Sequence, residues 1–243
     1  MNAANHSRSV VLFSGGQDSA TCLAWALKNF GYVETIGFYY GQAHAIELSV
    51  REDFLKFIRE IFPNWAKKLG PDRLVDMSFL SEIIKSTLTG NRESEILEKK
   101  LPSSFVPGRN LLFLNTAASY GYDRRLRHLV IGAGEVDFSG YPDCKRETLD
   151  AMSAAIKFGI EEDYEIHSPL MDLTKAKVWK LAYELGGRPL VDLILEASHS
   201  CYLGNRESRH EWGYGCGSCD ACRLRAEGWF SYRQTASGGK GGG

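Results

Sequence analysis

Short apolar runs alternate with longer amphipathic stretches along most of the chain. Strand-like runs occupy residues 9–13, 33–39, 73–77, 128–133 and 164–167, and helical patterns occupy residues 19–30, 45–69, 110–122, 148–159 and 174–185. Strands separated by helical crossovers are typical of a parallel sheet. The pattern therefore predicts an α/β fold, a Rossmann-like parallel sheet with helices on both faces.

Individual segments refine this fold. Residues 128–133 have the apolar content of a strand buried on both faces, residues 164–167 suit an edge strand, and residues 110–122 suit a buried helix. Residues 82–100 are charged and irregular, which indicates a surface excursion. In such a sheet, ligand-binding loops gather at the carboxyl ends of the strands.

Composition and charge narrow the class of protein. The 243 residues are 44% hydrophobic and 24% charged, with a net charge of −1, so nothing global favours a nucleic acid or an anionic membrane as partner. No apolar run approaches the roughly 20 residues of a membrane helix, and residues 1–8 are too polar and short for a secretory signal. We expect a cytoplasmic protein that binds neither membrane nor nucleic acid.

A glycine pair follows the first predicted strand. Gly15 and Gly16 allow a tight turn whose amide groups can approach phosphate oxygens, and the helix after it adds its positive end. Ser14 and Ser19 offer hydroxyl groups, while Asp18 could hold Mg²⁺ or cap the helix. This pattern predicts a phosphate-binding loop.

Two common nucleotide loops do not fit. A Walker A loop needs a Gly-Lys-Ser/Thr sequence, and residues 10–27 contain no lysine. The dinucleotide fingerprint is absent here and also fails at Gly132-Ala-Gly134, because Asp137 stands at the third glycine.

The remaining pattern, Ser-Gly-Gly-x-Asp-Ser, resembles the loop of the PP-loop ATP pyrophosphatases. In that family the loop grips pyrophosphate while the α-phosphate is attacked, which leaves AMP on the substrate. The resemblance implies ATP and Mg²⁺ as cofactors and catalytic roles for Asp18 and Ser19. It also implies that one continuous stretch binds the nucleotide, namely Phe13, Ser14, Gly15, Gly16, Gln17, Asp18, Ser19, Ala20, Thr21, Cys22 and Leu23.

Four of the six cysteines cluster near the C-terminus with metal-ligand spacing. They are Cys201, Cys216, Cys219 and Cys222. Four thiolates fill a tetrahedral Zn²⁺ shell with no open position, which predicts a structural site, and Gly217 permits the tight turn between two ligands. An iron–sulfur cluster or a redox dithiol remains an alternative. The neighbouring His199 and His210 are expected to be bystanders.

The pattern suggests three regions and two isolated cysteines. Residues 8–190 are predicted to form the ATP-binding domain, residues 191–235 a zinc-binding element and residues 236–243 a disordered glycine-rich tail. Cys22 reads as a small buried hydrophobe. Cys144 could contact substrate, although a packing role is favoured because only Lys145 and Arg146 are basic neighbours.

Further blocks resemble the 7-cyano-7-deazaguanine synthases of queuosine biosynthesis, in order and over most of the chain. They are Tyr40-Gly-Gln-Ala-His44, Phe105-Val-Pro-Gly-Arg-Asn110, the segment 135–144 that ends in Ser-Gly-Tyr-Pro-Asp-Cys144, and Ser200-Cys-Tyr202 with the cysteine cluster. Members of that family convert 7-carboxy-7-deazaguanine and ammonia to the nitrile. They adenylate first the carboxylate and then the amide and release AMP and pyrophosphate, so the resemblance implies an ATP-dependent C–N ligase, commonly a homodimer.

The resemblance also implies roles for residues beyond the loop. Arg109 and His44 would be catalytic, and the substrate-binding residues would be Asn110, Glu135, Asp137, Phe138, Tyr141 and Asp143. All of them except Asp143 have an ordinary alternative: a helix start for Arg109 and Asn110, a solvated strand exit for Glu135 and Asp137, core packing for the aromatic residues and a structural role for His44.

The chain departs from the family pattern in three places. Ala43 replaces an arginine, His167-Ser-Pro-Leu170 stands where the family usually has Glu-Thr-Pro-Leu, and the 14 residues between Cys201 and Cys216 include extra residues at 205–214.

These departures leave other functions open. One is a divergent ligase that captures the acyl-adenylate with a larger amine, possibly on a protein. A tRNA-thiolating or lysidine-forming PP-loop enzyme would need a basic face and a catalytic cysteine pair, which the net charge of −1 and the isolated Cys22 and Cys144 do not favour. Besides the synthase and these two enzymes, an adenine-nucleotide sensor without catalysis is a further possibility.

Overall fold

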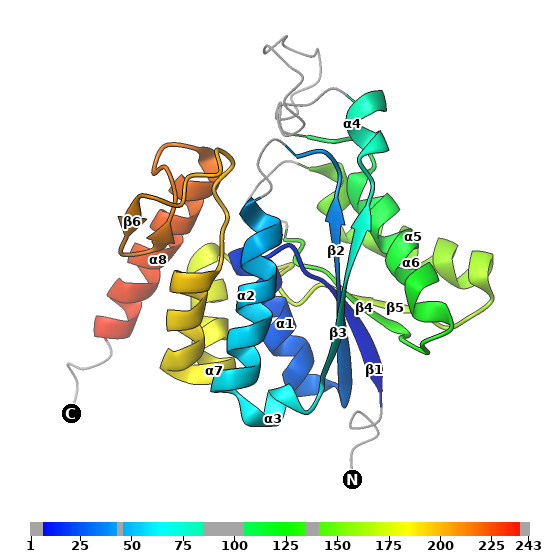
Figure 1. Cartoon of the computed structure of the whole chain (residues 1–243), viewed down its shortest axis with the longest axis horizontal. Helices are drawn as coiled ribbons and strands as arrows, with labels where there is room; N and C mark the ends of the chain where they lie inside the picture. Colours follow the sequence, from blue (N-terminus) through cyan, green and yellow to red (C-terminus); the bar gives the residue numbers. More distant parts are fainter. Residues whose placement is uncertain (1–6, 43–45, 85–104, 135–140, 239–243) are drawn as a thin grey trace.

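A parallel β-sheet forms the centre of the molecule (Figure 1). The structure, a computed structural model, describes residues 7–42, 46–84, 105–134 and 141–238. Within these residues the main sheet has five strands in the order β3-β2-β1-β4-β5, and every neighbouring pair is parallel. The strands are β1 (Arg8–Leu12), β2 (Tyr32–Tyr39), β3 (Leu69–Asp76), β4 (His128–Val130) and β5 (Glu165–His167). The predicted α/β fold is confirmed.

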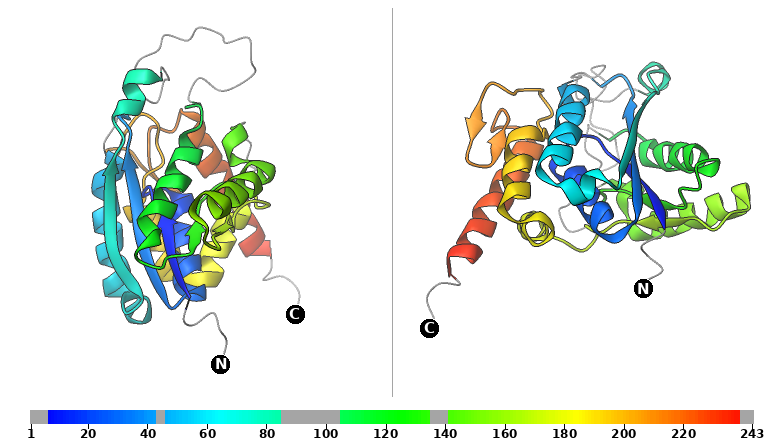
Figure 2. Two further views of the ribbon diagram at one scale, coloured as in Figure 1. Left: turned by 90° about the vertical axis from the view of Figure 1, so that its right-hand side faces the viewer. Right: turned by 60° about the horizontal axis from the view of Figure 1, so that its bottom comes forward.

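Helices cover both faces of the sheet (Figures 1 and 2). On one side of the sheet lie α1 (Gln17–Asn29), α2 (Ile46–Ile61) and α7 (Lys175–Ala197), with α8 (Asp220–Gly238) packed on α7. The other side is covered by α5 (Arg109–Tyr122) and α6 (Arg146–Ile160). Successive side chains of β1 point to opposite faces of the sheet and pack in two hydrophobic cores, one on each face. Val11 lies in the core beneath α1, and Val10 and Leu12 lie in the core beneath α5. The short helices are α3 (Pro63–Ala66), α4 (Phe79–Ile83) and the 3₁₀ helix η3 (Pro142–Cys144).

Three elements differ from the pattern-based expectation. The amphipathic stretch at 45–69 divides because Pro63 stops α2, and β3 already begins at Leu69. Helix α5 is buried along one face and is not surrounded by the core, since Leu112 is exposed. Helix α7 runs twelve residues beyond the expected end and contains a non-helical break at Gly187, where φ is 65°.

The sheet has a topological switch point beside β1. The chain moves outward from β1 to β2 and β3 on one side and to β4 and β5 on the other. The loops that follow β1 and β4 therefore diverge at the carboxyl edge and leave a crevice, which is where open α/β sheets bind ligands. The predicted phosphate loop lies at this point.

The C-terminal element shares the core of the main domain. Its two short antiparallel strands are β6 (Arg209–His210) and β7 (Gly213–Tyr214), and α8 follows and packs along α7. The rings of Trp179 and Trp229 meet edge-on with centroids 5.0 Å apart. Helix α8 reaches Gly238, so the helix includes the first three residues of the expected tail. Among the described residues, no helix combines the length and apolar composition that a membrane span requires.

Candidate active site

The phosphate loop between β1 and α1 is held by its own hydrogen bonds. Gly15 has a φ of 91°, a conformation that favours glycine. The Ser19 hydroxyl accepts hydrogen bonds from the amides of Ser14 and Gly15, both at 3.2 Å, and donates to the Gly16 carbonyl at 3.1 Å. The Ser19 hydroxyl thus braces the loop from inside.

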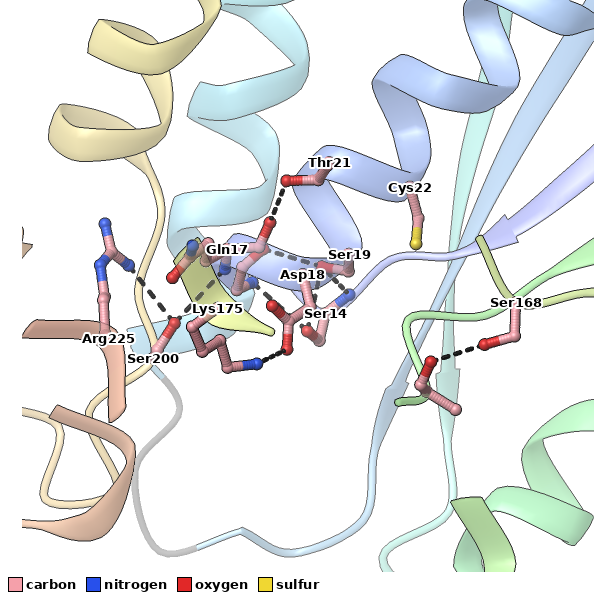
Figure 3. Close-up of polar contacts among 12 residues, drawn as sticks. Ser14, Gln17, Asp18, Ser19, Thr21, Cys22, Ser168, Lys175, Ser200 and Arg225 are labelled. Carbon is pink, nitrogen blue, oxygen red and sulfur yellow. Dashed lines mark hydrogen bonds and ion pairs between the residues drawn. The ribbon is translucent and has the colours of Figure 1, made fainter. Parts of the chain in front are cut away.

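Asp18 faces a lysine that is distant in sequence. Its Oδ2 accepts a 2.6 Å hydrogen bond from Nζ of Lys175, the first residue of α7 (Figure 3). Its Oδ1 is buried and has no hydrogen-bond partner among the described residues. The N-cap of α1 is Gly16, so of the two alternatives for Asp18, binding of Mg²⁺ or capping of the helix, capping is excluded. The carboxylate instead presents one oxygen that a cation can bind.

A segment from the C-terminal element closes one side of the loop. The amide of His199 donates to the Gly15 carbonyl at 3.0 Å, and the amide of Gln17 donates to the Ser200 hydroxyl at 3.3 Å. Arg225 in α8 donates to the same hydroxyl at 3.3 Å (Figure 3). The phosphate loop and the region around the cysteines are therefore directly bonded.

Arg225 is a buried cation beside this segment. It also donates to the Ser198 hydroxyl and to the carbonyls of Trp212 and Ile194 at 2.8–3.0 Å. Burial lowers the pKa of its guanidinium to about 10, which still leaves it charged at neutral pH. A buried positive charge near the glycine loop favours an anionic ligand there.

A cavity of about 350 Å³ opens between the phosphate loop and the start of α5. Four cationic side chains line it, namely Arg51, Arg109, Lys175 and Arg225, whereas Asp18 supplies the one carboxylate among the described lining residues. Arg51 is paired with Asp72 outside the lining. The cavity wall therefore carries an excess of positive charge, which suits a polyanion.

The opposite wall carries the predicted substrate residues. Arg109 lies between two aromatic rings, with its Cζ 5.5 Å from the centroid of Tyr40 and 5.8 Å from that of Tyr141. The backbone amide of Asn110 donates to Oδ2 of Asp143 at 3.1 Å, and the side-chain Nδ2 of Asn110 donates to Sγ of Cys144 at 3.3 Å. Arg109, Asn110, Tyr141 and Cys144 line the cavity. Asp143 is buried behind them and anchors the start of α5.

Cys144 has the environment of a protonated thiol. Burial and the neighbouring Asp143 raise its pKa to about 11, although Arg109 opposes them. The basic neighbours expected from the sequence, Lys145 and Arg146, are exposed and do not line the cavity. The relevant cation is Arg109, which the fold brings from another helix.

Several predicted site residues lie elsewhere. Ala20, Cys22 and Leu23 are fully buried in the core, and Thr21 donates to the Gln17 carbonyl within α1. None of these four lines the cavity, whereas Phe13, Ser14, Gly16, Gln17, Asp18 and Ser19 do. His44, Glu135, Asp137 and Phe138 lie outside the described residues.

The four C-terminal cysteines converge. The Sγ atoms of Cys201, Cys216, Cys219 and Cys222 lie within 4.8 Å of one another. The amides of Ser218 and Cys219 donate to Sγ of Cys216 at 3.4 and 3.3 Å. Although burial opposes them, these and further hydrogen bonds lower the Cys216 pKa. Such a site suits a thiolate-binding metal ion.

The residues around the cysteines shape the turn between them and attach the extra segment to the rest of the fold. Gly217 has a φ of 76°, which accounts for a glycine between two ligands. His210 bonds the Gly215 carbonyl at 3.0 Å and stacks on Trp212, and it is not part of the cysteine group. Arg206 in the extra segment 205–214 donates to the carbonyls of Ser198 and Glu196 and so ties that segment to the end of α7.

Three residues of the site were missed by the sequence reasoning. Ser200 was noted only as part of a motif, and Lys175 and Arg225 were not singled out. A signal existed for Arg225, because it shares an apolar helix face with Cys222 and Trp229 at i+3 and i+4 spacing. Lys175 gives no comparable signal, since only tertiary structure brings α7 to the phosphate loop.

Comparisons with known proteins agree with this geometry. Residues 8–233 match the family described as "Queuosine biosynthesis protein QueC". The chain is 55% identical to the 7-cyano-7-deazaguanine synthase of Halorhodospira halophila over 92% of this chain and 91% of that protein. The enzyme of the same name from Janthinobacterium sp. (strain Marseille) is 53% identical over 92% and 95% of the two chains.

One solved structure shares the fold at low sequence identity. It is described as a 4-thiouridine synthetase–RNA complex with bound ATP, and it superposes with a TM-score of 0.52 at 17% identity. The match covers 76% of this chain but 42% of that protein, so it supports the architecture alone.

Proposed function

Because the chain belongs to the family of the queuosine biosynthesis protein QueC, we propose that it converts 7-carboxy-7-deazaguanine and ammonia to 7-cyano-7-deazaguanine with ATP. The reaction is that of an ATP-dependent C–N ligase, and the named relatives are 7-cyano-7-deazaguanine synthases. We expect a cytoplasmic homodimer that acts on small molecules and does not bind nucleic acid.

One observation supports the proposal above the others. The cavity places the glycine loop opposite a wall that carries Arg109, Asn110 and Tyr141. The loop and Lys175 suit a triphosphate, while Arg109 suits a carboxylate and the flanking rings suit a planar base. ATP and an aromatic acid would thus meet in one cavity, as adenylation requires.

The reaction needs activation at oxygen because a carboxylate oxygen is a poor leaving group. In the first activation the substrate carboxylate attacks the α-phosphorus of ATP, pyrophosphate departs, and an acyl-adenylate forms. Ammonia then displaces AMP to give the primary amide and loses a proton. The amide oxygen is adenylated in the same way, and loss of AMP and a proton leaves the nitrile.

The residues of the phosphate loop would orient the departing pyrophosphate. The amides of Gly15, Gly16 and Gln17 donate to the hydroxyls of Ser19, Ser14 and Ser200 and so fix the shape of the loop. The positive end of the α1 dipole then favours phosphate oxygens at the loop, and Lys175 and Arg225 add positive charge. These fixed groups need no rearrangement as negative charge develops. Ser19 acts from behind by holding the loop in this shape.

The unpartnered Oδ1 of Asp18 is the atom that fits a magnesium ion bound with ATP. Mg²⁺ supplies charge neutralisation on the phosphates when it is bound. Asp18 also keeps Lys175 directed at the loop through their 2.6 Å hydrogen bond.

The four cysteines fit Zn²⁺, because their sulfur atoms converge and backbone amides donate to Cys216. A four-thiolate shell leaves no open position, so the ion would fix structure. Cys201 directly follows Ser200, whose hydroxyl bonds the Gln17 amide. The cysteine site would therefore hold residues 199–202 against the phosphate loop.

The decisive test is incubation of the purified protein with ATP, 7-carboxy-7-deazaguanine and ammonium, followed by mass spectrometry. We expect the nitrile together with AMP and pyrophosphate. An acid that stays unconsumed, or one that reacts only with a larger amine, would contradict the proposal. Lys175→Met is the matched inactive variant, and the exposed Lys177→Met in the same helix is its control.

A further inference from the structure

A second group of metal-ligating side chains lies at the edge of the main sheet, apart from the cysteines. It consists of His128 on β4 with Glu165 and His167 on β5. The parallel register pairs His128 with Glu165 and Val130 with His167. Because residues two apart share a face of a strand, all three side chains project from the same face of the sheet.

The three side chains converge on a small triangle of ligand atoms. Nδ1 of His128 lies 3.0 Å from Nε2 of His167, and one oxygen, Oε2 of Glu165, lies 3.4 and 3.5 Å from these two nitrogens. A point about 2 Å from all three atoms exists for such a triangle, and about 2.0–2.2 Å is the bond length of Zn²⁺ to imidazole nitrogen and carboxylate oxygen. The side chains therefore need little movement to bind one ion.

Aromatic side chains pack against the two histidine rings, and the side of the triangle at Glu165 is open to solvent. Phe30 packs against both histidine rings, with centroids 4.9 and 5.6 Å away, and Trp25 lies 5.6 Å from His167. The His128 and His167 side chains are 22% and 25% exposed, whereas Glu165 is 66% exposed. Water can thus reach the open side and complete a coordination shell.

We propose that His128, Glu165 and His167 form a binding site for a divalent transition-metal ion, with Zn²⁺ as the preferred ion. Two imidazoles and one carboxylate form a borderline-soft donor set that selects Zn²⁺, Co²⁺ or Ni²⁺ over Mg²⁺ or Ca²⁺. The site is independent of the ligase reaction.

The position of this site indicates what the ion would do. The His167 carbonyl accepts from the Ile131 amide at 2.9 Å, and the next residue, Ser168, donates to the Ala133 carbonyl at 2.6 Å. These bonds connect the ends of β4 and β5, from which the chain continues to Lys175 at the phosphate loop. An ion bound here would tie the edge strand β5 to β4. His167 is also one of the residues at which the chain departs from the family pattern.

Cobalt titration of the protein with its cysteine site already filled with zinc tests the proposal. We expect one equivalent of Co²⁺ to bind with weak visible absorption and without the intense thiolate-to-cobalt band that binding at cysteines would give. The apparent affinity should fall at least tenfold in His128→Gln and in His167→Gln. Zinc competition should displace the cobalt, and bound Zn²⁺ should raise Tm.

Glu165→Gln is the mildest ligand variant because the side chain is largely exposed, and Glu147→Gln on α6 is its exposed control. Loss of affinity in E165Q but not in E147Q, with unchanged ATP turnover in both, supports the site. Absence of cobalt binding to the wild-type protein, equal affinity in the H128Q/H167Q double variant, or thiolate bands alone would each overturn it. The three residues would then form a hydrogen-bonded cluster only.

Discussion

The phosphate loop and the cysteine loop are both tight turns with a left-handed glycine, but they are held in different ways. At the phosphate loop, Gly15 turns the chain and the hydroxyl of Ser19, in the first turn of α1, accepts hydrogen bonds from two loop amides. At the cysteine loop, Gly217 turns the chain, and the donors point at sulfur. The first loop is closed by hydrogen bonds to Ser19, whereas the second gathers four sulfur atoms within 4.8 Å of one another, an arrangement that suits a metal ion.

The difference shows how function can depend on a distant site. The two loops meet through residues 198–202, where His199 and Ser200 bond the phosphate loop and Cys201 belongs to the cysteine cluster. One wall of the cavity is therefore joined to the cysteine cluster, and with zinc as the proposed occupant that wall would depend on metal binding. Loss of the metal ion should therefore lower ATP turnover by displacing residues 198–202.

The largest effect should come from removing one of the four clustered cysteines, the proposed zinc ligands. We expect Cys219→Ser to lose zinc and ATP turnover, because structural zinc contributes about 10–16 kcal/mol of apparent binding free energy in small domains. Metal analysis and thermal unfolding would measure this. Ser218→Ala removes only a hydroxyl contact to Cys216 and should keep the metal. Full zinc content and an unchanged Tm in C219S would contradict the claim that the cysteine loop depends on a bound metal ion.

Removal of Lys175 should abolish most activity without loss of the fold. Its Nζ lies beside the phosphate loop, where a fixed positive charge stabilises departing pyrophosphate. We expect Lys175→Met to lower kcat about 10²–10³-fold, as for other preorganised electrostatic groups. Pyrophosphate release gives the rate, and Lys177→Met should match the wild type. A K175M enzyme with near-normal kcat would show that the loop works without this lysine.

The reactivity of Cys144 should separate the cavity thiol from an ordinary exposed one. Its raised pKa of about 11 means that the thiolate forms only as the pH rises toward that value. At pH 7.5 alkylation should be roughly two orders of magnitude slower than for a free cysteine with a pKa of about 8.5. Peptide mapping after iodoacetamide treatment of the zinc-loaded protein between pH 7 and 10 would follow it. Rapid, pH-independent labelling at Cys144 would contradict this environment.

The smallest effect should come from Ser200→Ala, which cuts the hydroxyl link between the two loops. Arg225 keeps its bonds to Ser198 and two carbonyls, so the metal site and Tm should be unchanged. Loss of one hydrogen bond of about 1 kcal/mol predicts a KM for ATP raised about fivefold. Ser208→Ala, in an exposed part of the extra segment, is the control. Equal KM values would indicate that the loops are not coupled here.

Local sequence signals predicted much of this molecule. The order of strands and helices followed from periodicity, and the two loops followed from glycine and cysteine spacing, since each is a contiguous motif. The start of β3 was missed because its residues are mostly exposed and include Pro71, so neither alternation nor a buried run marks this edge strand.

The composition of the cavity was harder to predict because its charges come from distant segments. Lys175 and Arg225 lie 157 and 207 positions after Asp18, and only the packing of α7 and α8 brings them to the loop. The opposite error occurred at Ala20, Cys22 and Leu23, which continue the motif in sequence. Helical periodicity turns them into the core, so adjacency along the chain did not imply contact with the ligand.

The account rests on the phosphate loop directing attack at the α-phosphorus of ATP. The most direct measurement uses 7-carboxy-7-deazaguanine labelled with ¹⁸O in its carboxylate, followed by mass spectrometry of the nucleotide products. We predict that the label appears in the phosphate of AMP while pyrophosphate stays unlabelled. Label in inorganic phosphate together with ADP would show attack at the terminal phosphorus and would contradict the account.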